Sequence, residues 1–246
     1  MAAPESTAKN FLVTATVAIV CSFAVSVTAV GLRERRESNQ DLDRMRHILE
    51  VAGLYDPSVP VLRSFARVEP RWLDLETGEY VPAGDVDPAA AKALGPAEDL
   101  AGIEKRERYV EVYLVRDLGR VAQIVLPVRG QGWSMLHGFL AIDRDLTTVR
   151  GITFHEHDET PGLGAEVDSP KWKSRWRDKR IYGPDGEVRL RVVKGSAEPG
   201  APHEVDGVTG ATLTTEGVNN LVRFWFGEQG YRRYLRQLEA KGVDHG

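Results

Sequence analysis

Cysteine is nearly absent from this chain of 246 residues, where Cys21 is the only one. A single cysteine excludes a disulfide framework within the chain and a cysteine-ligated zinc or iron–sulfur site. An excess of charge of one sign is also lacking, because the net charge is −4 while 28% of the residues are charged. This balance gives no indication of a nucleic-acid partner.

Several motifs of known chemistry are missing as well. The sequence has no phosphate-binding Walker loop, no G-x-G-x-x-G after a strand, and no nucleophile elbow, so it does not indicate a nucleotide hydrolase, a dinucleotide-binding enzyme or a serine hydrolase. His155 and His157 would share one face of a strand, but a metal site needs three or four donors and no others are evident. We therefore assign no catalytic residue and no metal ligand.

One long hydrophobic run is present, from Phe11 to Val30, and it contains no charged residue. At about 1.5 Å per residue, roughly 20 helical residues cross a hydrocarbon core of about 30 Å. The apolar core of a cleaved signal peptide is shorter, about 7–15 residues. We predict a tail over residues 1–10 and one transmembrane helix over 11–31, which makes the membrane a partner of the chain.

The charges that flank this run bear on its orientation. Lys9 is the only basic residue before it, whereas Arg33, Arg35 and Arg36 follow it. By the positive-inside rule these charges predict that the large C-terminal part lies in the cytoplasm.

A charged helical pattern continues beyond the membrane. Leu42, Met45 and Leu49 form one apolar stripe, and Gly53 is a suitable end, so we predict a membrane-proximal helix over 32–53. Residues 54–100 contain several prolines and little periodicity. We expect an irregular segment with short helices, packed on the main domain.

The main domain is expected over residues 101–246, and its first half reads as strands. Residues 108–117 and 120–129 predict a hairpin around Leu118-Gly119, and residues 135–143 and 147–157 predict a second pair. We predict a further strand over residues 187–193. Because these strands precede the helices, the fold class is α+β, with a mainly antiparallel sheet flanked by helices.

A loop and a short helix follow the second pair of strands. Pro161, Gly162 and Gly164 predict a loop whose backbone can approach a ligand closely. Ser169 before Pro170 predicts a capped helix start, and the basic helix that follows carries two tryptophans. We favour a solvated basic face with both rings in the core over a docking surface.

Another helix start lies in "DGVTGATLTTEG", residues 206–217. A helix beginning at Thr212 would place Val218, Leu221, Val222 and Trp225 on one face. The N–H groups of its first turn attract an anion, and Gly210 and Ala211, which have no side chain or a small one, leave space next to Thr212. These local features fit a phosphate site, but they also fit an ordinary threonine cap.

The same stretch resembles a motif of a known family. Residues 206–212, DGVTGAT, are similar to the flavinylation motif Asp-x-x-Ser/Thr-Gly-Ala-Ser/Thr of the FMN-binding domain family. "LRERRESNQDLDRMRHILEVAGLY" and "GFLAIDRDLTTVRGITFHEHDETPGLGAEVDSPKWKSRW" precede it in the order found in one family. Over nearly its whole length the chain resembles the C-type subunits of Na⁺-translocating NADH:quinone oxidoreductases.

Two alternatives remain. The G-type flavoprotein subunits of Rnf complexes share "ETPGLG" and "TGAT", but they are usually shorter and lack "ILEVAGLY". A non-redox anchored interaction protein, using its basic tryptophan helix, is the other.

The resemblance implies a membrane-anchored flavin electron carrier within an NADH:ubiquinone reductase that exports Na⁺. It implies other subunits of that complex as partners, and a flavin transferase that attaches FMN through a phosphoester to Thr212. Asp206 and Thr209 would belong to the recognition sequence, and Thr215 would lie near the phosphate. Further cofactor-binding positions are expected at Thr160, Leu163 and Gly164, in the loop beside the flavin ring, and at Gly210 and Ala211 next to Thr212.

The resemblance also implies a place in the cell. In the family the flavin domain lies on the periplasmic side of the bacterial inner membrane, and we follow this placement, since large C-terminal domains translocate largely regardless of flanking charge. "GQGWSMLHG" is one residue shorter than the family pattern, and His137 stands where tyrosine is common. We therefore carry no flavin-edge role over to Trp133 or His137.

Overall fold

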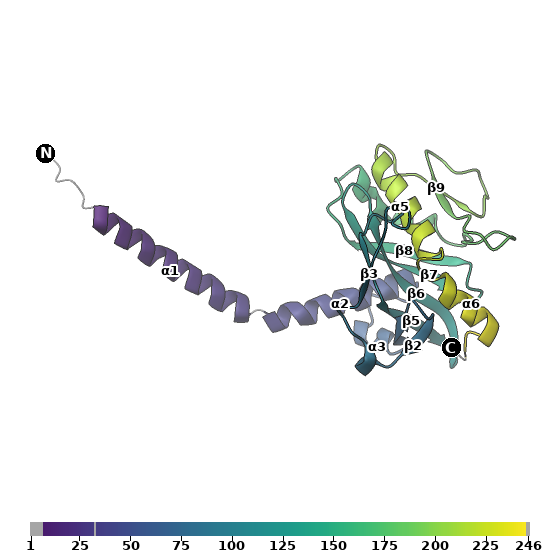
Figure 1. Cartoon of the computed structure of the whole chain (residues 1–246), viewed down its shortest axis with the longest axis horizontal. Helices are drawn as coiled ribbons and strands as arrows, with labels where there is room; N and C mark the ends of the chain where they lie inside the picture. The colour runs from purple at the N-terminus through teal and green to yellow at the C-terminus, as the bar shows by residue number, and fades with distance from the viewer. Residues whose placement is uncertain (1–6, 32, 245–246) are drawn as a thin grey trace. The chain divides into compact units, whose positions relative to one another are not determined.

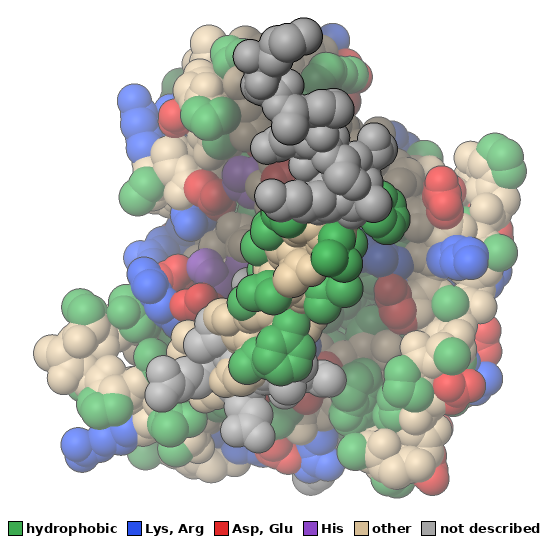
Figure 2. Space-filling model, turned by 90° about the vertical axis from the view of Figure 1, so that its left-hand side faces the viewer, with side chains coloured by type: hydrophobic (Ala, Val, Ile, Leu, Met, Phe, Trp, Pro, Cys, Tyr) green, Lys and Arg blue, Asp and Glu red, His purple; other side chains and the backbone are tan. Residues whose placement is uncertain are grey.

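The computed structural model describes residues 7–31 and 33–244; residues 1–6 of the expected tail, residue 32 and residues 245–246 lie outside the described part. The chain divides into two units, Met1–Arg44 and Met45–Gly246. In the first unit helix α1 spans Thr7–Gly31. Its window Phe11–Thr28 has a mean hydropathy of 2.2 and is long enough to cross a membrane. Hydrophobic side chains gather along this helix in Figure 2.

A six-stranded antiparallel sheet forms the centre of the second unit (Figure 1), with the strand order β2-β1-β5-β6-β7-β8. Its strands are β1 (Val68–Asp74), β2 (Glu79–Val81), β5 (Tyr109–Asp117), β6 (Arg120–Gln131), β7 (Met135–Asp143) and β8 (Val149–Glu156). Two small pairs lie beside it, β3 (Ala91–Ala93) with β4 (Lys105–Glu107), and β9 (Arg191–Val193) parallel to β10 (Glu204–Asp206). The predicted α+β class with a mainly antiparallel sheet is confirmed.

The remaining elements are helical, and the longest within the main domain lie near the C-terminus. They are α2 (Arg33–Val51), α3 (Val61–Phe65), α4 (Pro170–Ser174), α5 (Thr212–Trp225), α6 (Arg232–Lys241) and the 3-10 turns η1 (Ala83–Asp85) and η2 (Gly164–Asp168). Residues of α4, α5 and α6 join the main hydrophobic core on one face of the sheet. The end of α2, including Ile48 and Leu49, packs with Tyr113 and Phe139 in a second core.

Helix α5 lies very close to strand β6 because glycine occupies the contact. A Cβ added at Gly217 would lie 2.6 Å from the Cα of Gly132, and one added at Gly130 would lie 2.9 Å from the Cβ of Leu221. Real Cβ atoms do not approach so closely, so these glycines permit the approach. The first turn of α5 is thereby held against the turn that joins β6 to β7.

Residues 54–100 differ from the expected irregular segment because they contain three strands, β1, β2 and β3, of which β1 is the longest. This strand pairs with β5 over seven residue pairs, including Pro70 with Tyr113. On its other side β1 pairs with β2 only from Trp72 to Asp74. Pro70 therefore lies on a part of this edge that β2 does not cover. Proline has no N–H group to donate, so it is tolerated at such an unpaired edge position.

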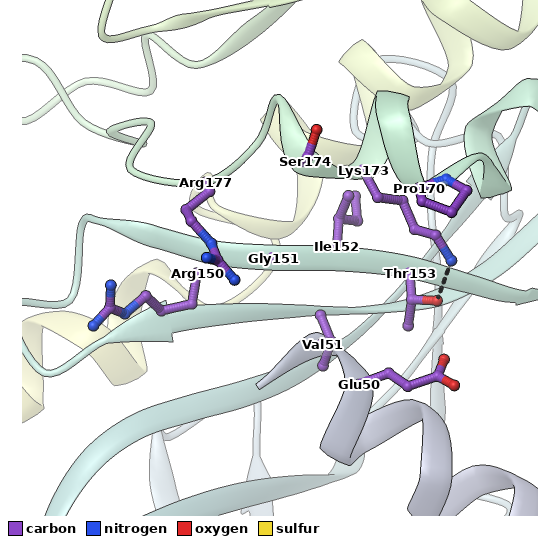
Figure 3. A pocket seen from close by; sticks show the side chains of 10 residues that line it. All are labelled: Glu50, Val51, Arg150, Gly151, Ile152, Thr153, Pro170, Lys173, Ser174 and Arg177. Carbon is purple, nitrogen blue, oxygen red and sulfur yellow. Dashed lines mark hydrogen bonds between the residues drawn. The ribbon is translucent and has the colours of Figure 1, made fainter. Parts of the chain in front are cut away.

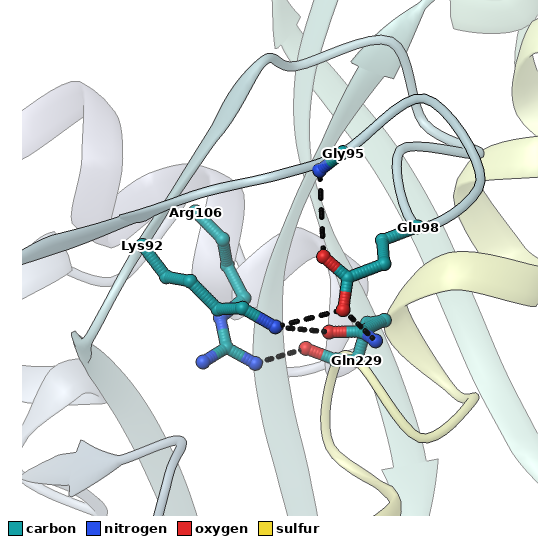
Figure 4. A network of polar contacts seen from close by, with 5 residues as sticks. All are labelled: Lys92, Gly95, Glu98, Arg106 and Gln229. Atoms are coloured by element: carbon teal, nitrogen blue, oxygen red, sulfur yellow. Dashed lines mark hydrogen bonds and ion pairs between the residues drawn. The ribbon is translucent and has the colours of Figure 1, made fainter.

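A polar network fixes the next part of this segment to the C-terminal helices (Figure 4). The ammonium group of Lys92 donates to Glu98 at 3.0 Å and to the side chain of Gln229 at 3.3 Å. The buried guanidinium of Arg106 donates to the backbone oxygen of Gln229. Because Gln229 lies between α5 and α6, the network ties β3 and β4 to that turn.

Candidate functional site

Three segments that are far apart in the sequence meet around one cavity of about 360 Å³. They are the turn between β6 and β7, the loop between β8 and η2, and the start of α5. This volume lies in the range of small-ligand pockets, roughly 300–1,000 Å³. The lining residues are Trp133, Glu159, Thr160, Leu163, Gly164, Gly210, Ala211, Thr212, Leu213 and Thr214.

Thr212 is the first residue of α5, as the sequence predicts, and its side chain is exposed. The preceding residue, Ala211, is the N-cap and provides no side-chain hydrogen bond to the helix. The first N–H groups of a helix have no partner within the helix, so a group attached at Thr212 would lie beside donors. The alternative of an ordinary threonine cap does not hold, because the cap residue is the alanine.

The approach to Thr212 is narrow. Gly210 has a φ of +75°, and a Cβ added there would lie 2.9 Å from the Cδ2 of Leu163. Glycine meets both demands, since it tolerates a positive φ and leaves the space open. Leu163 closes the other side of the gap while its own side chain remains 44% exposed.

The loop that contains Thr160 and Leu163 is a tight turn. The backbone oxygen of Thr160 accepts hydrogen bonds from the N–H of Leu163 at 3.1 Å and of Ala165 at 3.2 Å. Gly164, at the start of η2, is buried. The structure thus brings six predicted residues to one cavity, three from this loop and three from the start of α5.

The other predicted positions lie around the cavity and make different contacts. The carboxylate of Asp206 forms an ion pair with Arg175 and accepts the N–H of Ala197 at 2.8 Å. The hydroxyl of Thr215 is buried and accepts the N–H of Val208 at 3.0 Å. Both residues hold the strand and loop that lead to Thr212.

Thr209 lines a neighbouring cavity of about 430 Å³ on the far side of Leu163 and Gly210. Lys171 and Arg175 lie in the wall of this second cavity. The two cavities share Leu163 and Gly210, so the motif passes between them.

Glu159 and Trp133 line the first cavity, although neither was assigned to it from the sequence. The ring of Trp133 is 65% exposed, which is unusual for so large an apolar group, and Glu159 is 5% exposed, which is unusual for a carboxylate. Neither position carries a periodic pattern. Both lie in stretches that the resemblance compares, Glu159 in "ETPGLG" and Trp133 in "GQGWSMLHG", but their unusual burial is visible only in the folded chain.

The tryptophans of the basic segment are core residues. Trp172 and Trp176 are buried with ring centroids 5.4 Å apart, and the indole N–H of Trp172 donates to the backbone oxygen of Asp206 at 2.9 Å. The hydroxyl of Ser169 accepts the N–H of Trp172 at 3.2 Å and caps α4. The predicted helix start and the placement of both rings in the core are confirmed.

The two histidines considered as metal ligands have other partners. The Nε2 of His157 lies 2.6 Å from a carboxylate oxygen of Asp168, and the ring of His155 stacks on Phe139 with centroids 4.9 Å apart. Within residues 7–31 and 33–244 there is no group of three side chains suited to a metal ion.

A further hollow of about 330 Å³ lies between the end of α2, strand β8 and α4 (Figure 3). The ammonium group of Lys173 donates to the hydroxyl of Thr153 at 3.3 Å. Arg150 forms ion pairs with Asp143 at 3.2 Å and with Asp178 at 3.6 Å. Lys173 and Arg150, two of the charged residues that line the hollow, are therefore engaged with groups of the protein itself.

Comparison with known proteins gives consistent matches. The family model described as "FMN-binding domain" matches residues 132–227. The C-type subunit of the Na(+)-translocating NADH-quinone reductase of Yersinia pestis is 43% identical over 98% of this chain and 97% of its own length. The corresponding protein of Pseudomonas aeruginosa is 44% identical over 97% of this chain and 98% of its own.

Solved structures agree with these matches. The crystal structure of NqrC from Shewanella oneidensis has a TM-score of 0.75 at 33% identity and covers 82% of this chain and 99% of that one. The structure of the corresponding reductase subunit from Parabacteroides distasonis has a TM-score of 0.65 at 26% identity, covering 83% of this chain and 96% of that one.

Proposed function

The chain belongs to the family of C-type subunits of Na⁺-translocating NADH-quinone reductases, and from this premise we propose that it carries FMN covalently on Thr212 and relays electrons within such a complex. The observation that supports this most is the position of Thr212. Its hydroxyl is exposed at the N-terminus of α5 and lies at the rim of a cavity formed by the loop 159–164.

The residues around Thr212 fit the phosphate of FMN. A phosphodiester keeps one negative charge, and a helix N-terminus stabilises such a charge by about 0.3–1 kcal/mol at an exposed site. Since Ala211 caps the helix without a side-chain hydrogen bond, the N–H groups of the first turn are available to phosphate oxygens. Gly210 keeps the way to the Thr212 hydroxyl clear, because any larger residue at this position would place its Cβ against the side chain of Leu163.

The cavity beside Thr212 fits the ring system. Trp133, Leu163 and Leu213 offer apolar surface, with 65%, 44% and 54% of their area exposed. The tight turn at Thr160 lines the same cavity, and its backbone oxygen accepts the N–H groups of Leu163 and Ala165. We assign the ring to this cavity, with Thr160, Leu163 and Gly164 as contacts and Trp133 as a fourth residue that the sequence did not indicate.

Attachment requires a donor of FMN and a transferase. In the proposed step the Oγ1 of Thr212 attacks the FMN phosphorus of FAD and forms a new P–O bond. The P–O bond to AMP breaks, AMP leaves, and the hydroxyl proton passes to a base of the transferase. Asp206 and Thr209 are proposed as recognition sequence, and the exposure of Thr209, Gly210 and Thr212 leaves room for a second protein.

Bound FMN supplies one-electron redox chemistry, while the chain fixes where that chemistry occurs. A covalent tether removes any dissociation equilibrium, so the ring stays at one place between donor and acceptor. The described part of the chain has one helix suited to crossing a membrane. We therefore assign NADH oxidation, ubiquinone reduction and Na⁺ export to the assembled complex rather than to this chain alone.

The flavin domain is proposed to lie on the periplasmic side of the bacterial inner membrane, as in the family. Protease treatment of sealed vesicles of known orientation tests this placement. Cleavage within residues 101–246 from the periplasmic side is expected. Cleavage only from the cytoplasmic side would contradict the placement and would agree with the flanking arginines instead.

In-gel fluorescence tests the attachment itself. The chain purified from its native host, denatured and viewed under ultraviolet light, is expected to fluoresce, and Thr212→Ala is expected to abolish the signal. Thr160→Ala is the matched control, since Thr160 is an exposed threonine of the same cavity that contacts the ring but forms no covalent bond to FMN in this proposal. A non-redox anchored protein would show no fluorescence, and fluorescence that persists in Thr212→Ala would contradict attachment there.

A further inference from the structure

A buried carboxylate lies in the wall of the cavity assigned to the flavin. Glu159 is the first residue of the loop 159–164, and only 5% of its surface is exposed. Acidic side chains are almost never this buried unless they are paired. Glu159 is therefore held there by specific contacts.

These contacts join all three segments of the cavity. One carboxylate oxygen accepts the N–H of Ser134 at 2.9 Å and its hydroxyl at 3.1 Å. The other accepts the hydroxyl of Thr214 at 2.6 Å. Ser134 belongs to the turn between β6 and β7, and Thr214 belongs to the first turn of α5, so one side chain bridges both segments to the loop.

The space around the carboxylate is closely fitted. A Cβ added at Gly132 would lie 2.8 Å from the Oε1 of Glu159. A Cβ added at Gly164 would lie 2.7 Å from the Oγ1 of Thr214 and would overlap the carboxylate. Two glycines thus leave the room that this side chain needs.

The donors around this carboxylate are N–H and O–H dipoles, which suit its ionised form. All three of its hydrogen bonds come from N–H or O–H donors, and an ionised carboxylate acts only as an acceptor. Among residues 7–31 and 33–244 no lysine, arginine or histidine forms an ion pair with Glu159. In its ionised form this carboxylate places a negative charge in the cavity wall, and no ion pair with a cation of the described residues offsets it.

We propose that Glu159 is a positioning residue that fixes the three walls of the flavin cavity and that its negative charge lowers the midpoint potential of the flavin. This inference rests on the proposed function, because it requires FMN in this cavity. Reduction adds negative charge to the flavin, and a fixed anion in a partly desolvated wall opposes that addition. The carboxylate thus biases the flavin toward giving its electron away.

The test compares two neutralised carboxylates of the same loop region in the full chain in detergent. Glu159→Gln keeps the shape, and its amide can still accept from Ser134 and donate to Thr214. Glu166→Gln is the matched control, because Glu166 is exposed and solvent screens its charge. The intact mass of each protein is first measured by mass spectrometry to establish that FMN is attached, and the midpoint potential of the flavin is then measured by spectroelectrochemical titration.

We expect the potential of Glu159→Gln to rise and that of Glu166→Gln to stay at the native value. A change of about tenfold in the reduction equilibrium is the order expected for one charge at an effective dielectric constant of roughly 20, and it corresponds to about 59 mV for one electron. An unchanged potential in Glu159→Gln, with FMN attached, would overturn the proposal. A native chain without FMN would overturn the proposed function and this inference with it.

Thr214→Val keeps the proposal testable if Glu159→Gln fails to acquire FMN. This variant retains the carboxylate and replaces the threonine by a side chain of the same shape, but it removes the donor to one oxygen. Because less of the negative charge is then compensated, the potential is expected at or below the native value. A rise in Thr214→Val would contradict an electrostatic role for Glu159.

Discussion

Gly217→Ala sets helix propensity against packing in α5. Alanine is better than glycine inside a helix by about 1 kcal/mol. The added Cβ, however, would lie 2.6 Å from the Cα of Gly132 and would overlap the backbone oxygen of Gln131. Both atoms belong to the backbone at the end of β6, so no side-chain rotation relieves the contact. Overpacking costs about 1–3 kcal/mol, and we take the upper end here.

The net change is then a loss of about 2 kcal/mol in the free energy of unfolding, which lowers the Tm by about 4–8 °C for a domain of this size. Thermal unfolding followed by near-ultraviolet circular dichroism measures it. Gly84→Ala is the control, because nothing lies within 4 Å of a Cβ added at Gly84. An unchanged or higher Tm in Gly217→Ala would refute the close approach of α5 to β6 and, with it, the geometry that places Thr212.

Three further predictions concern the elements around the site. Ser169→Ala removes the cap of α4 and should cost about 0.5–2 kcal/mol in chemical denaturation, and a loss below the measurement error would argue against the bond to Trp172. Leu221→Ala truncates a fully buried side chain of α5 and should lower the free energy of unfolding by about 2–5 kcal/mol in the same assay. A loss below about 0.5 kcal/mol, typical of a surface position, would contradict this burial. Burial raises the pKa of Asp145, but hydrogen bonds from the side chain and backbone of Thr148 outweigh it and bring the pKa below its usual value. A carboxyl group with a lowered pKa stabilises the fold above its unfolded pKa of about 4, and this stabilisation is lost as the pH falls through the folded pKa. Asp145→Asn should therefore be less stable than the native chain at pH 7, and the difference in the free energy of unfolding should narrow below about pH 4. A difference that stays constant with pH would show that the pKa shift is absent.

The parts of the fold that the sequence predicts are those specified by local chemistry. Leu118-Gly119 forms the expected hairpin turn, with φ of +46° and +80°. The cap at Ser169 and the start of α5 at Thr212 follow from residue types at fixed offsets. Each of these features depends on a few neighbouring residues, so no knowledge of the rest of the chain is required.

Strand β1 could not be predicted in the same way. Its sequence contains Pro70 and three charged residues, and it becomes a strand because β5 pairs with it from about 40 residues further along the chain. The parallel pairing of β9 with β10 is likewise a tertiary feature, since nothing local distinguishes it from an antiparallel pair. Long-range pairing overrides local propensity in both cases.

The candidate site divides along the same line. Thr212, Gly210 and the loop with Thr160 and Leu163 were found through a contiguous motif and a resemblance, and the fold brings them to one cavity. Glu159 was missed because its role comes from burial and from two partners, Ser134 and Thr214, that only the folded chain brings together.

Peptide mass spectrometry of the chain purified from its native host tests the central claim most directly. The account predicts that the peptide containing residues 206–217 carries the added mass of FMN less one water and that fragmentation places it on Thr212. The same peptide with its unmodified mass, or an FMN adduct on Thr209, Thr214 or Thr215 instead, would contradict the assignment.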